Sequence, residues 1–292
     1  MGPYVFLYRN KKFDESCKIV HNFVDKFVYR ALEYRRTQDE EKHTGDKARR
    51  YIFLNELAKA TQDPQQLRDE ILNILLAGRD TTASLLSNTW HTLARRPDIW
   101  ARLKVEVDEL NGKAPDYETL RNMKYLKYVL NECKTPLLSP TRPYINTDHN
   151  TALRLYPVVP ANSRFAKRNT TIPRGGGPDG KSPVFIPKGM PVGYSVYSMH
   201  RREDIYGPDA LEFKPERWET LRVGWGYLPF NGGPRICVGQ QFALTEAGYT
   251  IVRLMQEFAS VEPRDERPWA EGLGITMACG NGVKVALKPR KG

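Results

Sequence analysis

FNGGPRICVG, residues 230–239, places a single cysteine, Cys237, in a glycine-rich loop directly before an apolar helical pattern that starts near Gln240. Backbone N–H groups and the helix dipole favour a thiolate at such a position, so Cys237 is suited to ligate a metal. The loop glycines allow close approach of a flat ligand, and Arg235 can pair with an anionic group. The alternative is a buried free cysteine beside a helix cap, which is the commoner arrangement for a lone cysteine.

Composition is that of an ordinary globular protein. The 292 residues are 40% hydrophobic and 11% aromatic, and 45 Lys and Arg against 34 Asp and Glu leave a net charge of +11. This excess favours acidic partners, anionic membrane surfaces or nucleic acid without choosing among them. The four cysteines are too far apart for a C-x-x-C metal pair, and a reduced thiol state is expected. No apolar run approaches the roughly 20 residues that span a bilayer.

Hydrophobic periodicity predicts helices over residues 18–34, 64–96, 97–110, 122–132 and 240–258. The charged stretch 35–50 is expected to be a solvated linker. Prolines, glycines and short pieces such as SPVFIP predict turns and small sheets between residues 155 and 215. The tail GITMACGNGVKVALKP predicts two strands joined by a Gly-Asn-Gly turn. The predicted fold class is therefore α+β, mainly helical, with small late β-sheets.

A second pattern, AGRDTT at residues 77–82, falls in the middle of the long predicted helix. The small residues Ala77 and Gly78 leave room for a flat cofactor, and the Thr81 hydroxyl can bond back to a carbonyl and locally open the helix. Taken alone, the same residues also describe a glycine-weakened helix with an Asp on its surface.

The F-x-x-G-x-R-x-C-x-G spacing of residues 230–239 resembles the haem-binding loop of the cytochrome P450 family at every fixed position. The resemblance implies haem b with Cys237 as the axial thiolate ligand of the iron. It also implies that Phe230 and Gly239 contact the haem and that Arg235 meets a propionate. Similarly, AGRDTT resembles the helix segment that crosses the other face of the haem, which assigns proton delivery to Asp80 and Thr81.

Three further segments resemble parts of the same family. The Pro160–Arg164 segment is similar to the strand whose arginine meets the second propionate, which points to Arg164. FKPERW, residues 213–218, is similar to the segment whose arginine, here Arg217, joins the Glu and Arg of a helical E-x-x-R motif. The corresponding residues here are Glu132 and Arg154, so the resemblance implies a buried Glu/Arg/Arg cluster. Taken as plain charge runs, these residues would be solvated surface.

Glu132 and Arg154 depart from that motif because they lie 22 positions apart instead of three, an excess of 19 residues. The extra piece, residues 133–151, contains three prolines and no periodicity, which contradicts a continuous helix. We interpret it as a non-native insertion from a retained intron, because its ends can encode a splice donor and acceptor whose removal preserves the reading frame. Splicing would then give NESLRLYP, with E-x-x-R restored. Otherwise the two side chains can still meet if the insertion loops out.

The texture of RLYPVVPANSRF and YSVYSMHRREDIYGPDA resembles fungal alkane-inducible P450s, which hydroxylate n-alkanes and fatty acids. That resemblance implies a haem-thiolate monooxygenase that inserts one oxygen atom of O2 into an aliphatic C–H bond. Its electrons would come from NADPH through a separate NADPH-cytochrome P450 reductase, and the full-length parent would lie at the endoplasmic reticulum membrane.

Because only 76 residues precede Ala77, we expect residues 1–292 to form a single partial P450 domain without its N-terminal portion. The main alternative is a truncated, non-catalytic remnant of such an enzyme. Nucleic-acid binding through the basic excess has no stacking or motif support.

Overall fold

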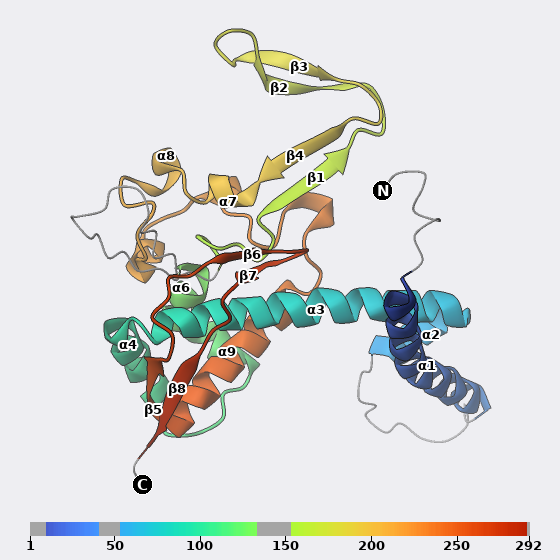
Figure 1. Cartoon of the computed structure of the whole chain (residues 1–292), viewed down its shortest axis with the longest axis horizontal. Helices are drawn as coiled ribbons and strands as arrows, with labels where there is room; N and C mark the ends of the chain where they lie inside the picture. Colours follow the sequence, from blue (N-terminus) through green and yellow to red (C-terminus); the bar gives the residue numbers. More distant parts are fainter. Residues whose placement is uncertain (1–9, 41–52, 133–152, 291–292) are drawn as a thin grey trace. The chain divides into compact units, whose positions relative to one another are not determined.

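A computed structural model describes residues 10–40, 53–132 and 153–290 (Figure 1). Helices dominate this part of the chain, and its strands form small two-stranded antiparallel sheets, which confirms the predicted fold class. The chain divides into two compact units, Met1–Arg79 and Asp80–Gly292. The predicted insertion, residues 133–151, lies outside the described residues.

The first unit contains α1 (Lys11–Glu40), α2 (Phe53–Ala60) and the beginning of α3 (Pro64–Leu93). Arg68 pairs with both carboxylate oxygens of Asp25 at 2.6 and 2.8 Å. The small apolar core of this unit comprises Val24, Val28, Ala31, Ala58 and Leu67.

The sequence predicted that α1 ends at Tyr34, and this was wrong. Charged residues continue the helix to Glu40. Arg35 is fixed by a tertiary contact, because its guanidinium donates to the Ala58 carbonyl oxygen at 2.6 Å. Local hydrophobic periodicity cannot predict a contact between residues so far apart in the sequence.

The core of the second unit lies among the later part of α3, α4 (Pro97–Asp108), α5 (Tyr117–Asn122), α6 (Lys124–Glu132) and α9 (Gln240–Glu257). Local signals set several of these boundaries. Pro97 begins α4, and the Asp116 side chain caps α5 by accepting from the Thr119 N–H at 2.8 Å. Large apolar side chains fill the interior, among them Leu85, Leu103, Leu126, Ile251 and Met255.

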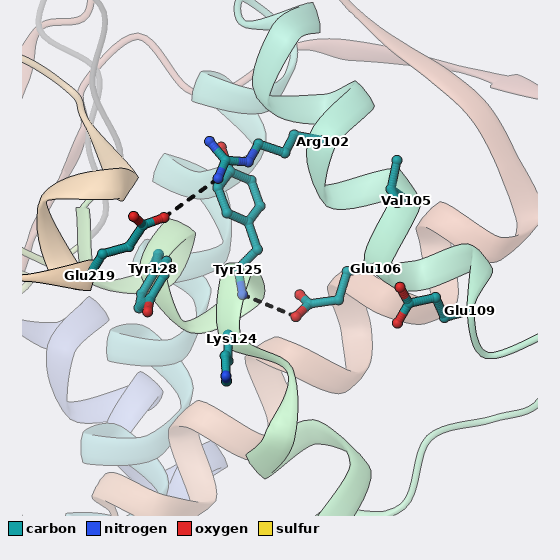
Figure 2. Close-up of a pocket in the computed structure, with 8 residues that line it drawn as sticks. All are labelled: Arg102, Val105, Glu106, Glu109, Lys124, Tyr125, Tyr128 and Glu219. Carbon is teal, nitrogen blue, oxygen red and sulfur yellow. Dashed lines mark hydrogen bonds and ion pairs between the residues drawn. The ribbon is translucent and has the colours of Figure 1, made fainter.

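The N-terminus of α6 is capped by a side chain from another helix. Both oxygens of the Glu106 carboxylate, on α4, accept backbone N–H groups of α6, from Tyr125 at 3.0 Å and Leu126 at 2.8 Å. Figure 2 shows the bond from Tyr125. The Arg102 guanidinium lies 4.5 Å from the Tyr125 ring centroid and pairs with Glu216 at 2.5 Å. Arg102, Glu106 and Tyr125 line a surface pocket of about 540 Å³. Most of the charged side chains that line this pocket already form ion pairs or hydrogen bonds within the protein. We therefore interpret the contacts around it as structural, because they orient α6.

The strands of this unit form separate two-stranded antiparallel sheets. β1 (Ala161–Phe165) pairs with β4 (Pro191–Ser195), and β2 (Thr170–Gly176) pairs with β3 (Ser182–Ile186). Short helices α7 (Val196–Met199) and α8 (Glu203–Tyr206) follow, and then the single-turn segments η2 (Pro215–Glu219), η3 (Gly224–Gly226) and η4 (Gly233–Arg235).

The predicted hairpin of the tail was wrong in its pairing. The two strands exist, but β7 (Met277–Cys279) pairs with β6 (Glu271–Leu273), whereas β8 (Val285–Pro289) pairs with β5 (Phe258–Pro263). The Trp100 indole donates to the Ala259 carbonyl oxygen at 3.1 Å and so attaches β5 to α4. Tertiary anchoring therefore overrides the local turn.

Within the described ranges, none of the helices combines the length and the apolar character that crossing a bilayer requires.

After residues 133–152, Leu153 and Arg154 take the positions that would directly continue α6. The Arg154 N–H donates to the Asn131 carbonyl oxygen at 3.1 Å. If the 19 excess residues are not counted, this is the N–H to i−4 carbonyl bond of an α-helix. Leu153 is likewise buried in the core that α6 lines. The flanks of the insertion thus keep the spacing of an uninterrupted E-x-x-R helix.

Deletion of residues 133–151, which joins Glu132 to Ala152, is therefore expected to stabilise the chain. The gain from the lost loop-closure entropy is roughly 2–3 kcal/mol. Soluble yield and the denaturant midpoint of the two chains measure it. Equal or better behaviour of the undeleted chain would identify residues 133–151 as a tolerated loop.

Candidate functional site

The loop before α9 is closed by its own backbone. The Cys237 N–H donates to the Phe230 carbonyl oxygen at 2.9 Å, and the Ile236 N–H donates to Gly233 at 3.0 Å. Helix α9 then begins at once, with the Ala243 N–H bonded to the Gly239 carbonyl oxygen at 2.9 Å. The loop therefore presents the exposed Cys237 thiol at the N-terminus of an 18-residue helix.

Two glycines are required by this geometry. A Cβ atom on Gly232 would lie 2.5 Å from the Trp225 ring, so a side chain there would displace the indole. Gly233 has a φ of 68°, in the left-handed region that favours glycine. The loop conformation thus explains the Gly-Gly pair of the sequence motif.

The surface around Cys237 combines apolar side chains with a cation. Val238 is fully exposed, Phe242 is 72% exposed and Ile236 is 53% exposed. Arg235 is exposed too, and it forms no ion pair within the described part of the chain. One thiol, apolar contacts and a guanidinium suit a flat apolar group with an anionic edge, so these residues fit haem.

Arg164 is connected to the same loop through β4. Its guanidinium donates to the Asn162 side-chain oxygen at 3.0 Å and lies 5.8 Å from the Tyr194 ring centroid. The Tyr194 hydroxyl in turn donates to the Asn231 side-chain oxygen at 2.7 Å, next to Phe230. The structure thus brings Arg164 near the loop that carries Arg235 and Cys237.

The structure also brings Glu132, Arg154 and Arg217 together, although Glu132 and Arg154 are 22 positions apart. Arg154 binds the Glu132 carboxylate through two nitrogens, both at 2.7 Å, and Arg217 binds it at 2.6 Å. The Glu132 and Arg154 side chains are fully buried, and Arg217 is 6% exposed. The Trp218 indole and the Lys214 backbone N–H complete the contacts of the carboxylate.

Both guanidiniums use all five of their N–H donors, which is the condition for burying such charges. Apart from Glu132, their acceptors are mostly backbone carbonyl oxygens of the irregular segment between residues 200 and 212. Arg154 donates to His200, Ala210 and Glu212, and Arg217 donates to Tyr206, Asp209 and Glu212.

His200 is a residue that the sequence reasoning missed. Its Nε2 accepts from the Leu228 N–H at 2.9 Å, so the proton sits on Nδ1 and is donated to the Arg154 carbonyl oxygen at 2.9 Å. The ring is fully buried, and this burial lowers the pKa of His200 to about 4. A neutral histidine thus links the Glu132 cluster to Leu228, which lies two residues before the start of the Cys237 loop at Phe230. A lone His before two arginines offered no pattern that could reveal this role.

Asp80 and Thr81 lie half-buried on α3, which is helical throughout Pro64–Leu93. One turn later, the Ser84 hydroxyl donates to the Met277 carbonyl oxygen at 2.6 Å. The β6–β7 hairpin therefore lies against the helix segment that follows Asp80 and Thr81. The neighbouring Thr82 hydroxyl is buried and has no hydrogen-bond partner among the described residues.

Comparison with known proteins shows the family. The Cytochrome P450 family matches residues 3–133 and 140–278, and this chain belongs to it. The chain is 49% identical over 292 residues to Cytochrome P450 monooxygenase himC of Aspergillus japonicus, covering 99% of this chain and 49% of the relative. It is 48% identical over 294 residues to Cytochrome P450 52A13 of Debaryomyces hansenii, covering 97% of this chain and 52% of the relative. The chain thus spans about half the length of the curated relatives it matches.

The Glu132 cluster gives a first prediction about stability. Glu132→Gln leaves the buried Arg154 guanidinium without its counter-charge and leaves Arg217 with Asp209 alone, so the free energy of unfolding should fall by about 3–5 kcal/mol in urea denaturation. Glu212→Gln is the matched control, because Glu212 has an exposed side chain and joins the cluster only through its backbone. Its effect should stay within about 0.5 kcal/mol. Equal losses in both variants would mean that the cluster does not stabilise the fold.

His200 gives a prediction about pH. Because its pKa is lowered to about 4 from 6.5, the unfolded chain takes up a proton between these values that the folded chain refuses. The contribution of neutral His200 to the free energy of unfolding is therefore complete above pH 6.5. It falls by about 3 kcal/mol as the pH drops towards 4. His200→Gln should remove this component from the slope of unfolding free energy against pH. The same slope in both proteins would contradict the assignment.

Proposed function

We propose that the protein containing this chain is a haem-thiolate monooxygenase that inserts one oxygen atom of O2 into aliphatic C–H bonds. The observation that carries the proposal is the exposed Cys237 thiol, held at the start of α9 by a loop with the P450 spacing. A thiolate donor increases the electron density on haem iron and promotes O–O cleavage.

In this proposal each residue of the loop has one task. Cys237 ligates the iron, and Phe230 and Gly239 pack against the haem. Arg235, which is exposed, holds one propionate. Arg164 holds the other, because its strand β1 pairs with β4, and Tyr194 of β4 donates to Asn231 of the loop. The bound haem supplies the redox chemistry, and these side chains fix its position and compensate its charges.

Asp80 and Thr81 are proposed to hold and deliver protons during oxygen activation. Both are half-buried, and the buried Thr82 hydroxyl lies beside them. A short relay of hydroxyl, carboxylate and water can pass a proton inward while bulk solvent is kept out. This segment therefore determines whether electrons end in product or in peroxide.

We propose n-alkanes or fatty acids as substrates. The β6–β7 hairpin, bonded to α3 one turn beyond Asp80, exposes Leu273 to 70% and Ile275 to 81% at its tip. Exposed aliphatic side chains next to the proposed proton relay favour an aliphatic substrate. The resemblance of RLYPVVPANSRF and YSVYSMHRREDIYGPDA to fungal alkane-inducible P450s supports the same class.

Electrons are proposed to come from NADPH through a separate reductase, with the full-length parent at the endoplasmic reticulum membrane.

The ligand assignment predicts the spectrum of a full-length protein that contains this segment. Cys237→Ala should abolish the ferrous-CO Soret band of thiolate ligation together with product formation. Cys279→Ala is the matched control, because that thiol already donates to the Gly282 carbonyl oxygen at 3.3 Å and should leave the band intact. An unchanged band in Cys237→Ala would exclude Cys237 as the ligand.

The proton-delivery assignment predicts uncoupling. In the same full-length protein, Thr81→Ala should lower product formed per NADPH at least roughly 10-fold and raise hydrogen peroxide correspondingly, because the second proton arrives at the wrong place. Thr81→Ser keeps the hydroxyl and should restore most of the coupling. If Thr81→Ala left coupling unchanged, Thr81 would have no part in the reaction.

A further inference from the structure

The stretch of chain from Gly224 to Cys237 has little regular structure, apart from the single turns η3 and η4. Its backbone hydrogen bonds join near neighbours, such as the Asn231 N–H to the Leu228 carbonyl oxygen at 3.1 Å and the Cys237 N–H to Phe230 at 2.9 Å. Bonds of this kind shape a turn without fixing where the turn lies in the protein. Helix α9 fixes the C-terminal end of the stretch, so the rest of it needs anchoring by groups outside it.

His200, between α7 and α8, supplies such an anchor. Its Nε2 atom accepts from the Leu228 backbone N–H at 2.9 Å, and Leu228 is the residue whose carbonyl oxygen starts the turn to Asn231. The ring is itself held by a reciprocal pair of bonds with Arg154. The Nδ1–H donates to the Arg154 carbonyl oxygen, and the Arg154 guanidinium donates to the His200 carbonyl oxygen, both at 2.9 Å. The Leu228 amide is thus bound by an acceptor whose orientation is already fixed.

The position of His200 requires one donor and one acceptor on the same side chain, and a neutral imidazole provides both on a rigid ring. The ring is fully buried, so removal of its acceptor leaves the Leu228 N–H without a ready replacement. Burial also lowers the pKa of His200 to about 4, which leaves Nε2 without a proton at neutral pH. The acceptor for Leu228 is therefore present under physiological conditions.

We infer that His200 is a positioning residue for the Cys237 thiolate and that it acts through the Leu228 N–H. The bound Leu228 places Phe230 two residues later, and the Phe230 carbonyl oxygen receives the Cys237 N–H. Without the Leu228 bond, the turn before Phe230 is free to shift, and the sulfur loses the position from which it holds the iron. The inference rests on the proposed function, in which Cys237 is the iron ligand.

Two variants separate the two bonds of the His200 ring. In His200→Asn, the amide nitrogen can replace Nδ1 and keep the bond to Arg154, but no atom remains at the position of Nε2. In His200→Gln, the amide oxygen can replace Nε2 and keep the bond from Leu228, but no atom remains at the position of Nδ1. Both variants remove the same ring, so a role in overall stability alone would affect them alike.

The first measurement is the ferrous-CO spectrum of a full-length protein that contains this segment. The ratio of the thiolate-ligated carbonyl complex to the complex without thiolate should fall roughly 10-fold in His200→Asn, as expected for an amide left without its partner. In His200→Gln the ratio should stay within about 2-fold of the parent value. Trp100→Phe is the matched control, because it removes a hydrogen bond of the same unit at β5 and should leave the ratio unchanged.

The second measurement is amide hydrogen exchange of the 292-residue chain without haem. Residues 224–238 should exchange roughly 10-fold faster in His200→Asn than in His200→Gln, while α4 exchanges equally in both. Equal spectra in the two His200 variants would overturn the inference, and so would faster loop exchange with an unchanged spectrum. A thiolate band that survived Cys237→Ala would instead refute the proposed function, and the exchange rates distinguish that failure because they are measured without haem.

Discussion

The second unit depends on the ion pairs and hydrogen bonds of the Glu132 carboxylate. This carboxylate is fully buried and accepts from Arg154, Arg217, Trp218 and the Lys214 backbone. Transfer of such a charge from water is costly, and it is tolerated only where the counter-charges and hydrogen bonds are complete. Here they are complete on both sides, because the carboxylate is saturated and both guanidiniums use all their donors. The remaining donors then hold backbone carbonyls between residues 200 and 212, where no helix or sheet ladder of useful length can do so.

From this cluster, hydrogen bonds lead to the Cys237 loop in a few steps. His200 bonds the Arg154 carbonyl on one side and the Leu228 N–H on the other, and the Tyr227 hydroxyl donates to the Asn131 side chain at 3.1 Å. Burial raises the pKa of Tyr227 well above its ordinary value, so the hydroxyl keeps its proton and remains a donor. Three residues after Tyr227, the Phe230 carbonyl oxygen accepts from the Cys237 N–H. The position of the thiol therefore depends on a charge cluster that does not itself touch it.

The sequence predicted those features whose causes are local. Pro64 and Pro97 begin helices, and the chain enters α9 directly after Gly239, because proline and the capping positions act within one turn. The charged end of α1, the pairing of β5 with β8 and the role of His200 depend on contacts far apart in sequence, and periodicity cannot reveal these. For the site, the family resemblance indicated which residues belong together. It could not supply most of the acceptors from the 200–212 segment, because those are backbone carbonyl oxygens and leave no residue pattern.

Two free-energy terms compete at residues 133–151. One is the entropic cost of closing a loop between Glu132 and Arg154, and the other is the stabilisation from the Glu132 cluster. The Arg154 N–H bond to Asn131 keeps Glu132 and Arg154 on one helical face, so the ends of the intervening segment are held within about one helical turn. Closure of a loop of that length costs roughly 2–3 kcal/mol, because the entropy grows only with the logarithm of length. Loss of one partner from a buried ion-pair cluster costs about 3–5 kcal/mol, which is comparable or larger. The cluster can therefore form across the insertion, although sequence spacing alone suggested that the insertion threatens it. The insertion still reduces the net stability by the closure term, and a term of that size is a substantial fraction of the typical net stability of about 5–15 kcal/mol.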